Sequence, residues 1–169
     1  TMQGGTMGYL ATPGALVVID TQYPAPAATA LAGLRERSDR AVDVLVNTHH
    51  HGDHTSGNAV FSPDARQFVA HREAARLKKL ATESRGDTEP EAYPTSTYSE
   101  SLRIDLGDEV LSLRHFGPAH TGGDSVVHFE NADVVHMGDL MFHRMPPFID
   151  KPSGANIANW ITTLETVHH

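Results

Sequence analysis

The sequence of 169 residues contains no cysteine. Thiolate chemistry is therefore excluded, and any metal site has to be built from nitrogen and oxygen ligands. The absence of cysteine also leaves no redox evidence about the compartment. A chain of this length suits one domain, expected to span residues 1–169, with a core that folds without disulfides.

Basic residues are scarce relative to acidic ones. The sequence has 13 lysines and arginines against 21 aspartates and glutamates, a formal net charge of −8 and no basic cluster. This balance argues against a nucleic acid or an anionic membrane as the partner. A small-molecule substrate is the expected partner.

Long apolar runs are also missing. No segment approaches the roughly 20 apolar residues that cross a bilayer, and the opening TMQGGTMGYL lacks the basic and apolar regions of a signal peptide. The sequence therefore predicts a soluble protein. The compartment stays open between cytoplasm and periplasm, because the sequence starts at Thr1 rather than at an initiator methionine and a signal could have been removed.

The first part of the sequence alternates strand and helix patterns. Two apolar runs broken by a Pro-Gly pair predict a β-hairpin over residues 6–20, and the second run, 16–19, is expected to be buried on both faces. Residues 27–41 have the alanine, leucine and charge spacing of an amphipathic helix. Residues 42–46, VDVLV, then predict a strand, which completes a β-α-β unit.

The later part of the sequence is richer in strand patterns. Residues 66–70 predict a strand, 71–84 a helix, and the polar, proline-containing stretch 86–101 a surface loop. Four short strands and a final helix are expected after it, at residues 102–106, 109–116, 125–130, 133–137 and 157–167. Two β-rich halves that carry helices imply an α/β sandwich.

The segment THHHGDH, residues 48–54, follows the predicted strand directly. Alternate side chains of an extended chain share a face, so His49 and His51 are expected to point to the same side. His50 is expected to point away. Two imidazoles therefore converge beyond the end of the strand.

The residues after these histidines add more polar groups to the same place. Gly52 supplies a position where the chain turns, and Asp53 and His54 bring a carboxylate and a third imidazole. Thr55 is a candidate N-cap for a short helix over residues 56–60. Adjacent histidines alone are typical of a solvated turn, whereas the whole string indicates a metal, since zinc and related ions take imidazole nitrogen and carboxylate oxygen.

The string resembles the H-x-H-x-D-H motif of the metallo-β-lactamase superfamily. Two companion segments occur in the expected order, GPAHTGGD with His120 and VVHMGDLMF with Asp139. The hairpin and the strand before the motif also match, so the resemblance covers nearly the whole chain. It implies an αββα sandwich that is incomplete at both ends.

The resemblance also implies a set of metal ligands. One ion would be held by His49, His51 and His120. A second ion would be held by Asp53 and His54, and Asp139 would bridge the two. The expected cofactor is zinc, as one or two ions, with iron or manganese as alternatives.

The implied reaction is hydrolysis, in which a metal-bound hydroxide attacks a small ester, thioester, lactone or amide. Asp53 is the expected catalytic residue, because it is placed to orient the hydroxide and to handle its proton. Asp20 and Asp124 lie beside the motifs, where each would either accept an N–H from a ligating histidine or shape a turn.

Other histidines and apolar residues carry weaker predictions. His115, His128 and His136 lie in strand patterns and are expected to be ordinary core or surface residues, and His143 is not expected to be a ligand. An apolar lip over the substrate and ordinary loop packing are equally good interpretations of Met141, Phe142, Pro146, Pro147 and Phe148.

The sequence departs from the family pattern in two places. The family's second metal normally gains a further histidine well after the bridging aspartate, and here only 30 residues follow Asp139. A truncated chain with an unpaired sheet edge is therefore expected, and such an edge favours a homo-oligomer. The segment Asp20-Thr21-Gln22 stands where the family often has Asp-Thr-Gly, which bears on the shape of the loop.

Several functions remain open on the sequence alone. A metal-dependent hydrolase, dinuclear in its complete form, is the leading hypothesis, and a β-lactamase proper is the runner-up among hydrolases. An iron-dependent oxidoreductase of the same fold and a non-catalytic metal-binding remnant are alternatives from other classes.

Overall fold

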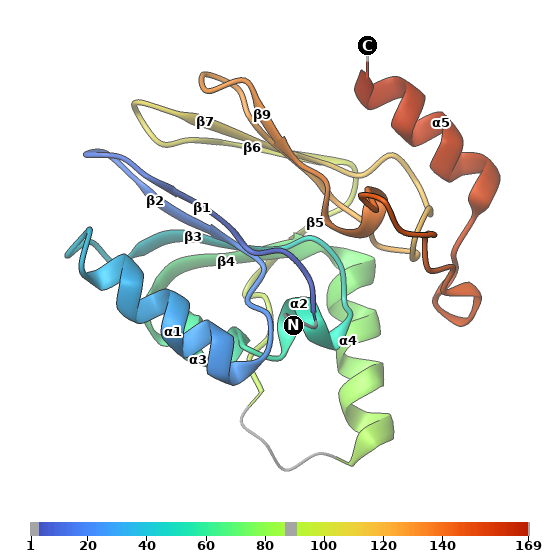
Figure 1. The fold of residues 1–169 in the computed structure, drawn as a ribbon, viewed down its shortest axis with the longest axis horizontal. Helices are drawn as coiled ribbons and strands as arrows, with labels where there is room; N and C mark the ends of the chain where they lie inside the picture. The colour runs from blue at the N-terminus through green and yellow to red at the C-terminus, as the bar shows by residue number, and fades with distance from the viewer. Residues whose placement is uncertain (1–3, 87–90, 169) are drawn as a thin grey trace.

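Residues 4–86 and 91–168 are described by the computed structural model, in which two β-sheets lie face to face between helices (Figure 1). The first sheet has the strand order β1-β2-β3-β4-β5. Its strands are β1 (Gly8–Ala11), β2 (Leu16–Ile19), β3 (Val42–Asn47), β4 (Ala65–His71) and β5 (Ser96–Tyr98). β1 runs antiparallel to β2, and the other neighbours are parallel.

The second sheet has the order β6-β7-β8-β9, and all of its neighbours are antiparallel. Its strands are β6 (Ser101–Asp105), β7 (Val110–Arg114), β8 (Val126–Phe129) and β9 (Val134–His136). The four strand patterns expected in this part of the sequence are therefore confirmed.

Helices lie on the outer side of the first sheet and beside one end of the second (Figure 1). They are α1 (Pro24–Arg35), α2 (Gly52–Thr55), α3 (Asn58–Phe61), α4 (Arg72–Arg85) and α5 (Ile157–His168). Short 3₁₀ turns are η1 (Ser62–Asp64), η2 (Gly138–Leu140) and η3 (Lys151–Ser153). Helices α1, α3 and α4 lie on the first sheet, and α5 lies beside the second.

Strand β2 shows why this sequence forms a layered structure. Val17 and Ile19 point between the sheets, where they pack with residues such as Leu111 on β7. Leu16 and Val18 point the other way, into the core beneath α1 and α3. A continuously apolar strand is buried on both faces because parallel strands are covered on both sides.

Helix α5 packs against one end of the second sheet, whose outer face elsewhere is open, with Val135 40% exposed. Trp160 on that helix is buried in a cluster with Ala119, Val126 and Leu140. The order of helices and sheets is that of the expected αββα sandwich, with the outer helical layer present over only part of the second sheet.

Three predicted elements differ from the structure, and two of them lie outside the histidine loop. Helix α1 begins at Pro24 and ends at Arg35, earlier than the predicted span 27–41, because proline is well accommodated in a first helical turn. The predicted loop 86–101 contains strand β5, whose Tyr98 is buried and donates a hydrogen bond to Ser125 Oγ at 2.6 Å. Residues 87–90 of that loop lie outside the described residues.

The prediction that Thr55 caps a helix over residues 56–60 is wrong. Helix α2 already begins at Gly52, and Thr55 is its last residue. The Thr55 hydroxyl donates to the carbonyl oxygens of His50 and His51 instead. The chain turns into a helix directly after His51, which places His54 inside α2 rather than at the entrance of a later helix.

β9 is an edge strand of the second sheet, with half-exposed Val134 and Val135. The expectation that a missing strand leaves this edge unpaired, and that the edge favours a homo-oligomer, stays a prediction. Among residues 4–86 and 91–168, no helix is long and apolar enough to cross a membrane.

A buried amide network fixes the start of the histidine loop to the neighbouring strand. Asn58 Oδ1 accepts hydrogen bonds from Thr21 Oγ1 at 2.9 Å and from Asn47 Nδ2 at 3.0 Å. Asn58 Nδ2 donates to Asn47 Oδ1 and to the carbonyl oxygen of Ala92. All of the hydrogen-bonding capacity of this fully buried amide is used.

We expect Asn58→Ala to lower the free energy of unfolding by about 2 to 4 kcal/mol, because it leaves buried polar groups of Thr21 and Asn47 without a partner. Urea denaturation measures the change. Asn131→Ala is the matched control, since that exposed amide donates one hydrogen bond, to the carbonyl oxygen of Asp108. Equal losses in the two variants would contradict the structural role of the network.

Candidate metal centre

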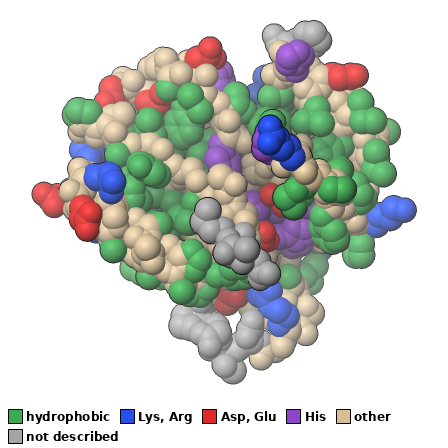
Figure 2. All heavy atoms as spheres, viewed as in Figure 1, with side chains coloured by type: hydrophobic (Ala, Val, Ile, Leu, Met, Phe, Trp, Pro, Cys, Tyr) green, Lys and Arg blue, Asp and Glu red, His purple; other side chains and the backbone are tan. Residues whose placement is uncertain are grey.

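Three loops at one end of the sandwich bring the predicted site residues together. The first follows β3 and carries His49 to His54, the second joins β7 to β8 and carries His120, and the third follows β9 and carries Asp139 in η2. Figure 2 shows histidine side chains next to acidic ones near the middle of the viewed face.

Three imidazole nitrogens face one another in this cluster. The Nε2 atom of His49 lies 3.1 Å from Nδ1 of His51, and Nε2 of His120 lies 3.0 Å from the same Nδ1. His49 and His120 are fully buried. Burial, reinforced by the neighbouring imidazoles, lowers the pKa of His49 well below its ordinary value, and burial also lowers the pKa of His120.

The other nitrogen of each ring contacts an oxygen outside the cluster. His49 Nδ1 lies 3.1 Å from Thr48 Oγ1, and His120 Nδ1 donates to the carbonyl oxygen of Phe148 at 2.8 Å. His51 Nε2 lies 2.8 Å from the Asp150 carboxylate. These acceptors hold the N–H on the outer nitrogen, so each inner nitrogen presents a lone pair to the cluster.

His54 repeats this arrangement next to the first three histidines. Its Nδ1 lies 2.7 Å from the Asp20 carboxylate, and its Nε2 lies 3.1 Å from Oδ1 of Asp139 and 3.7 Å from Oδ2 of Asp53. The Nε2 atom is buried and lacks a hydrogen bond of good geometry. Burial alone would lower the pKa of His54, but Asp20 and Asp139 outweigh it and raise this pKa to about 10.

Asp139 lies between the two groups of ligands. One of its carboxylate oxygens is 3.1 Å from His54 Nε2 and the other is 3.7 Å from His120 Nε2. Burial would raise the pKa of Asp139, but His54, with His120 and His51, holds it below its ordinary value. Two sets of donor atoms, each compact enough for one ion, share this carboxylate; they are His49, His51, His120 with Asp139, and Asp53, His54 with Asp139.

The donor set fits a divalent cation. The lone pairs of His49 and His120 each lie about 3 Å from that of His51, which is repulsive unless a positive charge lies among them, and the low pKa of His49 disfavours a proton there. Two imidazole nitrogens bound tetrahedrally to zinc lie about 3.3 Å apart, close to the observed spacing. The side chains of His51, Asp53 and Asp139 are 20–30% exposed, so the centre is open to a small molecule.

Asp20 occupies a strained position that serves the site. Its φ angle is +58°, where residues other than glycine are uncommon. Its carboxylate accepts hydrogen bonds from the backbone N–H and the hydroxyl of Thr48 at 2.8 and 2.7 Å, in addition to contacting His54. The expected role of Asp20 as an acceptor for a candidate ligand therefore agrees with the geometry.

Gln22, which stands where the family often has glycine, adopts a backbone conformation typical of glycine. Gln22 has a φ of +58°, the conformation that glycine adopts most easily. Its side-chain amide donates to the carbonyl oxygen of Gly5 at 2.7 Å. Gly5 lies so close to the His54 ring that a β-carbon there would be 2.1 Å from Nε2. The glutamine thus secures an N-terminal segment that covers the His54 imidazole.

The carboxylate of Asp124 has no hydrogen bond to a candidate ligand among the residues that the structure describes, although its backbone carbonyl oxygen lies 2.7 Å from His115 Nδ1. Its carboxylate accepts from the backbone N–H groups of Ala119 and Thr121 and from the Thr121 hydroxyl. The alternative interpretation, a turn-forming aspartate, holds instead. Asp124 shapes the short loop that presents His120, and burial raises its pKa.

Sequence reasoning missed Asp150, which orients His51 from 99 positions further along the chain. Burial would raise the pKa of Asp150, but hydrogen bonds from Ser153 and His51 keep it low. The same carboxylate caps η3 by accepting from the backbone N–H of Ser153. The local pattern could have identified Asp150 as a capping residue, because it follows a proline-rich stretch. The pattern could not have predicted that Asp150 pairs with His51, because that contact depends on tertiary structure.

His50 points away from the converging nitrogens as expected, with its Nε2 3.2 Å from Ser153 Oγ and 3.9 Å from Asp150 Oδ2. With His51 and Asp150 it forms a third compact group of donor atoms, which does not contain Asp139. His115 stacks on His71 with ring centroids 3.8 Å apart, and burial lowers the pKa of His71 to about 4. His128 lies 3.7 Å from the exposed carboxylate of Asp133. Neither His136 nor His143 belongs to a metal-sized cluster in the described part of the chain.

Comparison with known proteins agrees with this arrangement. Residues 2–168 match the family model described as the metallo-beta-lactamase superfamily. The chain belongs to this superfamily. In the metallo-β-lactamase superfamily the ions are divalent metals, and this chain has histidine and aspartate clusters that could hold them.

Two curated relatives match most of the chain. It is 29% identical over 147 residues to the 2,4-dinitroanisole O-demethylase subunit alpha of Nocardioides sp. strain JS1661, a match covering 84% of the chain and 43% of that protein. It is 30% identical over 133 residues to the hydroxyacylglutathione hydrolase of Cereibacter sphaeroides strain ATCC 17025, covering 78% of the chain and 45% of that protein. The chain spans less than half the length of these relatives.

Solved structures of metallo-β-lactamases share the fold. The enzyme from Pontibacter korlensis has a TM-score of 0.76 at 20% identity, covering 94% of the chain and 71% of that structure. FEZ-1 from Legionella gormanii has a TM-score of 0.71 at 17% identity, with coverages of 95% and 67%. At these identities the likeness establishes the fold alone.

We expect Asp20→Asn to weaken binding of the ion at His54 by about 10- to 100-fold, because the neutral amide is a poorer acceptor for the imidazole N–H. Asparagine tolerates a positive φ, so the backbone should persist. Isothermal titration with zinc measures the effect. Asp133→Asn is the matched control, since Asp133 has a φ of +53° and is exposed. Equal affinities in the two variants would contradict the role of Asp20.

The metal-free protein should lose stability between about pH 6.5 and pH 10. The pKa of His54 is about 10 in the folded chain and 6.5 in the ordinary state. The stabilisation of the folded state by the protonated His54 imidazole is therefore fully present below pH 6.5, and it is lost as the pH rises through 10. Urea denaturation with a chelator measures the decline, which should be on the order of a few kcal/mol.

His54→Gln should remove that part of the pH dependence while other groups titrate as before. A wild-type protein that loses no more stability than His54→Gln over this range would show that the charge of His54 is not stabilising.

Proposed function

We propose that the chain carries the metal centre of a hydrolase that cleaves a small ester, thioester, lactone or amide. Zinc is the proposed ion, with two ions in the complete centre. The observation that carries the proposal is the convergence of three imidazole lone pairs, from the buried His49 and His120 and the partly exposed His51, beside a carboxylate that faces a fourth imidazole.

The proposed ligands follow from the two compact donor sets. His49, His51 and His120 would hold one ion, Asp53 and His54 the other, and Asp139 would contact both. Bound cations of this kind acidify water and polarise a substrate carbonyl. The histidine rings are already oriented by their outer hydrogen bonds, so little rearrangement is needed on binding.

Asp53 is the proposed catalytic residue. Its side chain is 30% exposed, the most open among the candidate ligands, and its carboxylate lies 3.7 Å from His54 Nε2. From this position it can accept a hydrogen bond from water at the mouth of the centre and take up a proton as that water attacks. The water would attack a substrate carbon that lies in front of the Asp53 carboxylate.

The relatives favour thioesters among the candidate substrates. Hydroxyacylglutathione hydrolase acts on a thioester, and at 30% identity it matches residues over 78% of the chain. The O-demethylase relative is named for an aryl methyl ether, which makes such ethers a second class to assay. Likeness to β-lactamases rests on fold alone, so β-lactam hydrolysis has weaker support.

We expect the purified protein to bind up to two zinc ions and Asp139→Ala to lose occupancy at both sites, because Asp139 faces both donor sets. Elemental analysis after dialysis against zinc measures the stoichiometry. Asp39→Ala, at an exposed carboxylate that belongs to neither donor set, is the control. Unchanged occupancy in Asp139→Ala would reject the bridging role.

The same preparations, assayed on thioester, lactone, ester, aryl ether and β-lactam substrates, test the reaction itself. Thioester turnover that disappears in Asp53→Asn and Asp139→Ala supports the proposal. Iron as the tightly bound metal, with oxygen consumed during turnover, would instead indicate an oxidoreductase.

A further inference from the structure

We infer that the apolar cavity beside His120 binds the apolar part of the substrate, an acyl chain or an aromatic ring. This inference rests on the proposed function, since the bond to be cleaved would lie at the metal centre while the apolar group occupies the cavity.

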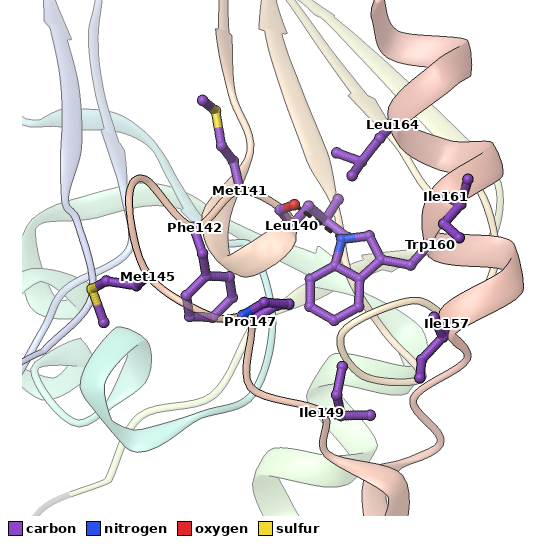
Figure 3. A pocket seen from close by; sticks show the side chains of 10 residues that line it. All are labelled: Leu140, Met141, Phe142, Met145, Pro147, Ile149, Ile157, Trp160, Ile161 and Leu164. Carbon is purple, nitrogen blue, oxygen red and sulfur yellow. Dashed lines mark hydrogen bonds between the residues drawn. The ribbon is translucent and has the colours of Figure 1, made fainter.

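The cavity lies between α5 and the loop that follows η2, and its volume is about 440 Å³ (Figure 3). This volume is within the range of sites for small molecules. All of its lining residues are apolar; they are Leu140, Met141, Phe142, Met145, Pro147, Ile149, Ile157, Trp160, Ile161 and Leu164.

The chemistry of the lining selects the class of ligand. The indole N–H of Trp160 is its one side-chain donor, and it is already used in a hydrogen bond of 3.0 Å to the carbonyl oxygen of Leu140. A polar ligand would therefore lose its hydrogen bonds to water without replacement. The two methionines are flexible and adapt to apolar groups of different shape.

The cavity shares a wall with the metal centre. Leu140 directly follows the proposed bridging residue Asp139. The ring centroids of Phe142 and Trp160 lie 5.9 and 5.6 Å from that of His120, and 6.3 Å from each other. A ligand that fills the cavity therefore lies one aromatic layer away from the proposed ligand His120.

Much of the lining stays in contact with water when the cavity is free. Met141, Met145 and Ile161 are 63, 65 and 54% exposed. Covering such surface with an alkyl chain is favourable, and each methylene that enters should tighten binding by about fourfold. Since the cavity is finite, this gain should stop at a definite chain length.

The single tryptophan of the chain allows a direct test, because Trp160 lines the cavity. We expect straight-chain alcohols of increasing length to change Trp160 fluorescence in the metal-free protein, with affinity rising by about fourfold per methylene and then levelling. Ile161→Asn should weaken binding of the longer alcohols by at least tenfold. Val134→Asn, at an equally exposed apolar position on β9, should have no effect.

Met145→Gln, in the loop rather than on α5, is a second variant that should weaken binding even if the helix tolerates Ile161→Asn poorly. In zinc-loaded protein, kcat/KM for thioesters should rise with acyl length in the wild type and in Val134→Asn, but not in Ile161→Asn.

The outcomes separate the inference from the proposed function. Thioester turnover without any dependence on acyl length, or without a change in Trp160 fluorescence, would overturn the inference and leave the hydrolase intact. Binding of alcohols without turnover of any substrate would count against the proposed function alone. A dimer that Ile161→Asn dissociates, detected by light scattering, would show that a second copy covers the cavity and would overturn the inference.

Discussion

The crowding of imidazole lone pairs is the constraint on which the site depends. His49, His51 and His120 turn their inner nitrogens toward one point because each outer nitrogen is held by an oxygen of the surrounding structure. Such a cluster is unfavourable when empty of positive charge, and burial of His49 and His120 makes protonation costly. The fold maintains an arrangement whose favourable partner is a cation.

The surrounding residues show how the fold stabilises this arrangement. Asp20 adopts a positive φ and binds both Thr48 and His54, so one strained residue orients two parts of the histidine loop. The amide network of Asn58 ties the same loop to the ends of β2 and β3. Rigidity at the site is therefore supplied by buried polar groups that are almost fully paired.

Local patterns in the sequence predicted much of the fold and placed four of the six candidate ligands together, His49, His51, Asp53 and His54. The alternation of side chains beyond β3 was sufficient to bring His49 and His51 together, and apolar runs identified the buried strands. His120 and Asp139 came from the family resemblance, because no local rule relates residues so far apart. Local patterns gave two wrong predictions. Thr55 was predicted to cap a helix, but the chain enters a helix earlier, at Gly52. The polar stretch around Tyr98 was predicted to be a loop, but it contains a strand in which Tyr98 is buried.

Two contacts that sequence reasoning missed, to His51 and to His120, are long-range. Asp150 and the Phe148 carbonyl orient two candidate ligands, yet their position depends on how the loop after η2 returns toward β3. Asp124 was ambiguous for a related reason, since an aspartate beside a motif serves equally well in a turn.

The candidate ligands come from loops attached to different sheets. His49, His51 and His54 follow a strand of the first sheet, whereas His120 and Asp139 belong to loops of the second. A bound ion would therefore act as a cross-link between the two halves of the sandwich, and its affinity would depend on how completely the halves have docked. Tight metal binding would therefore require that the two sheets have already docked, since each sheet alone offers only an incomplete set of ligands.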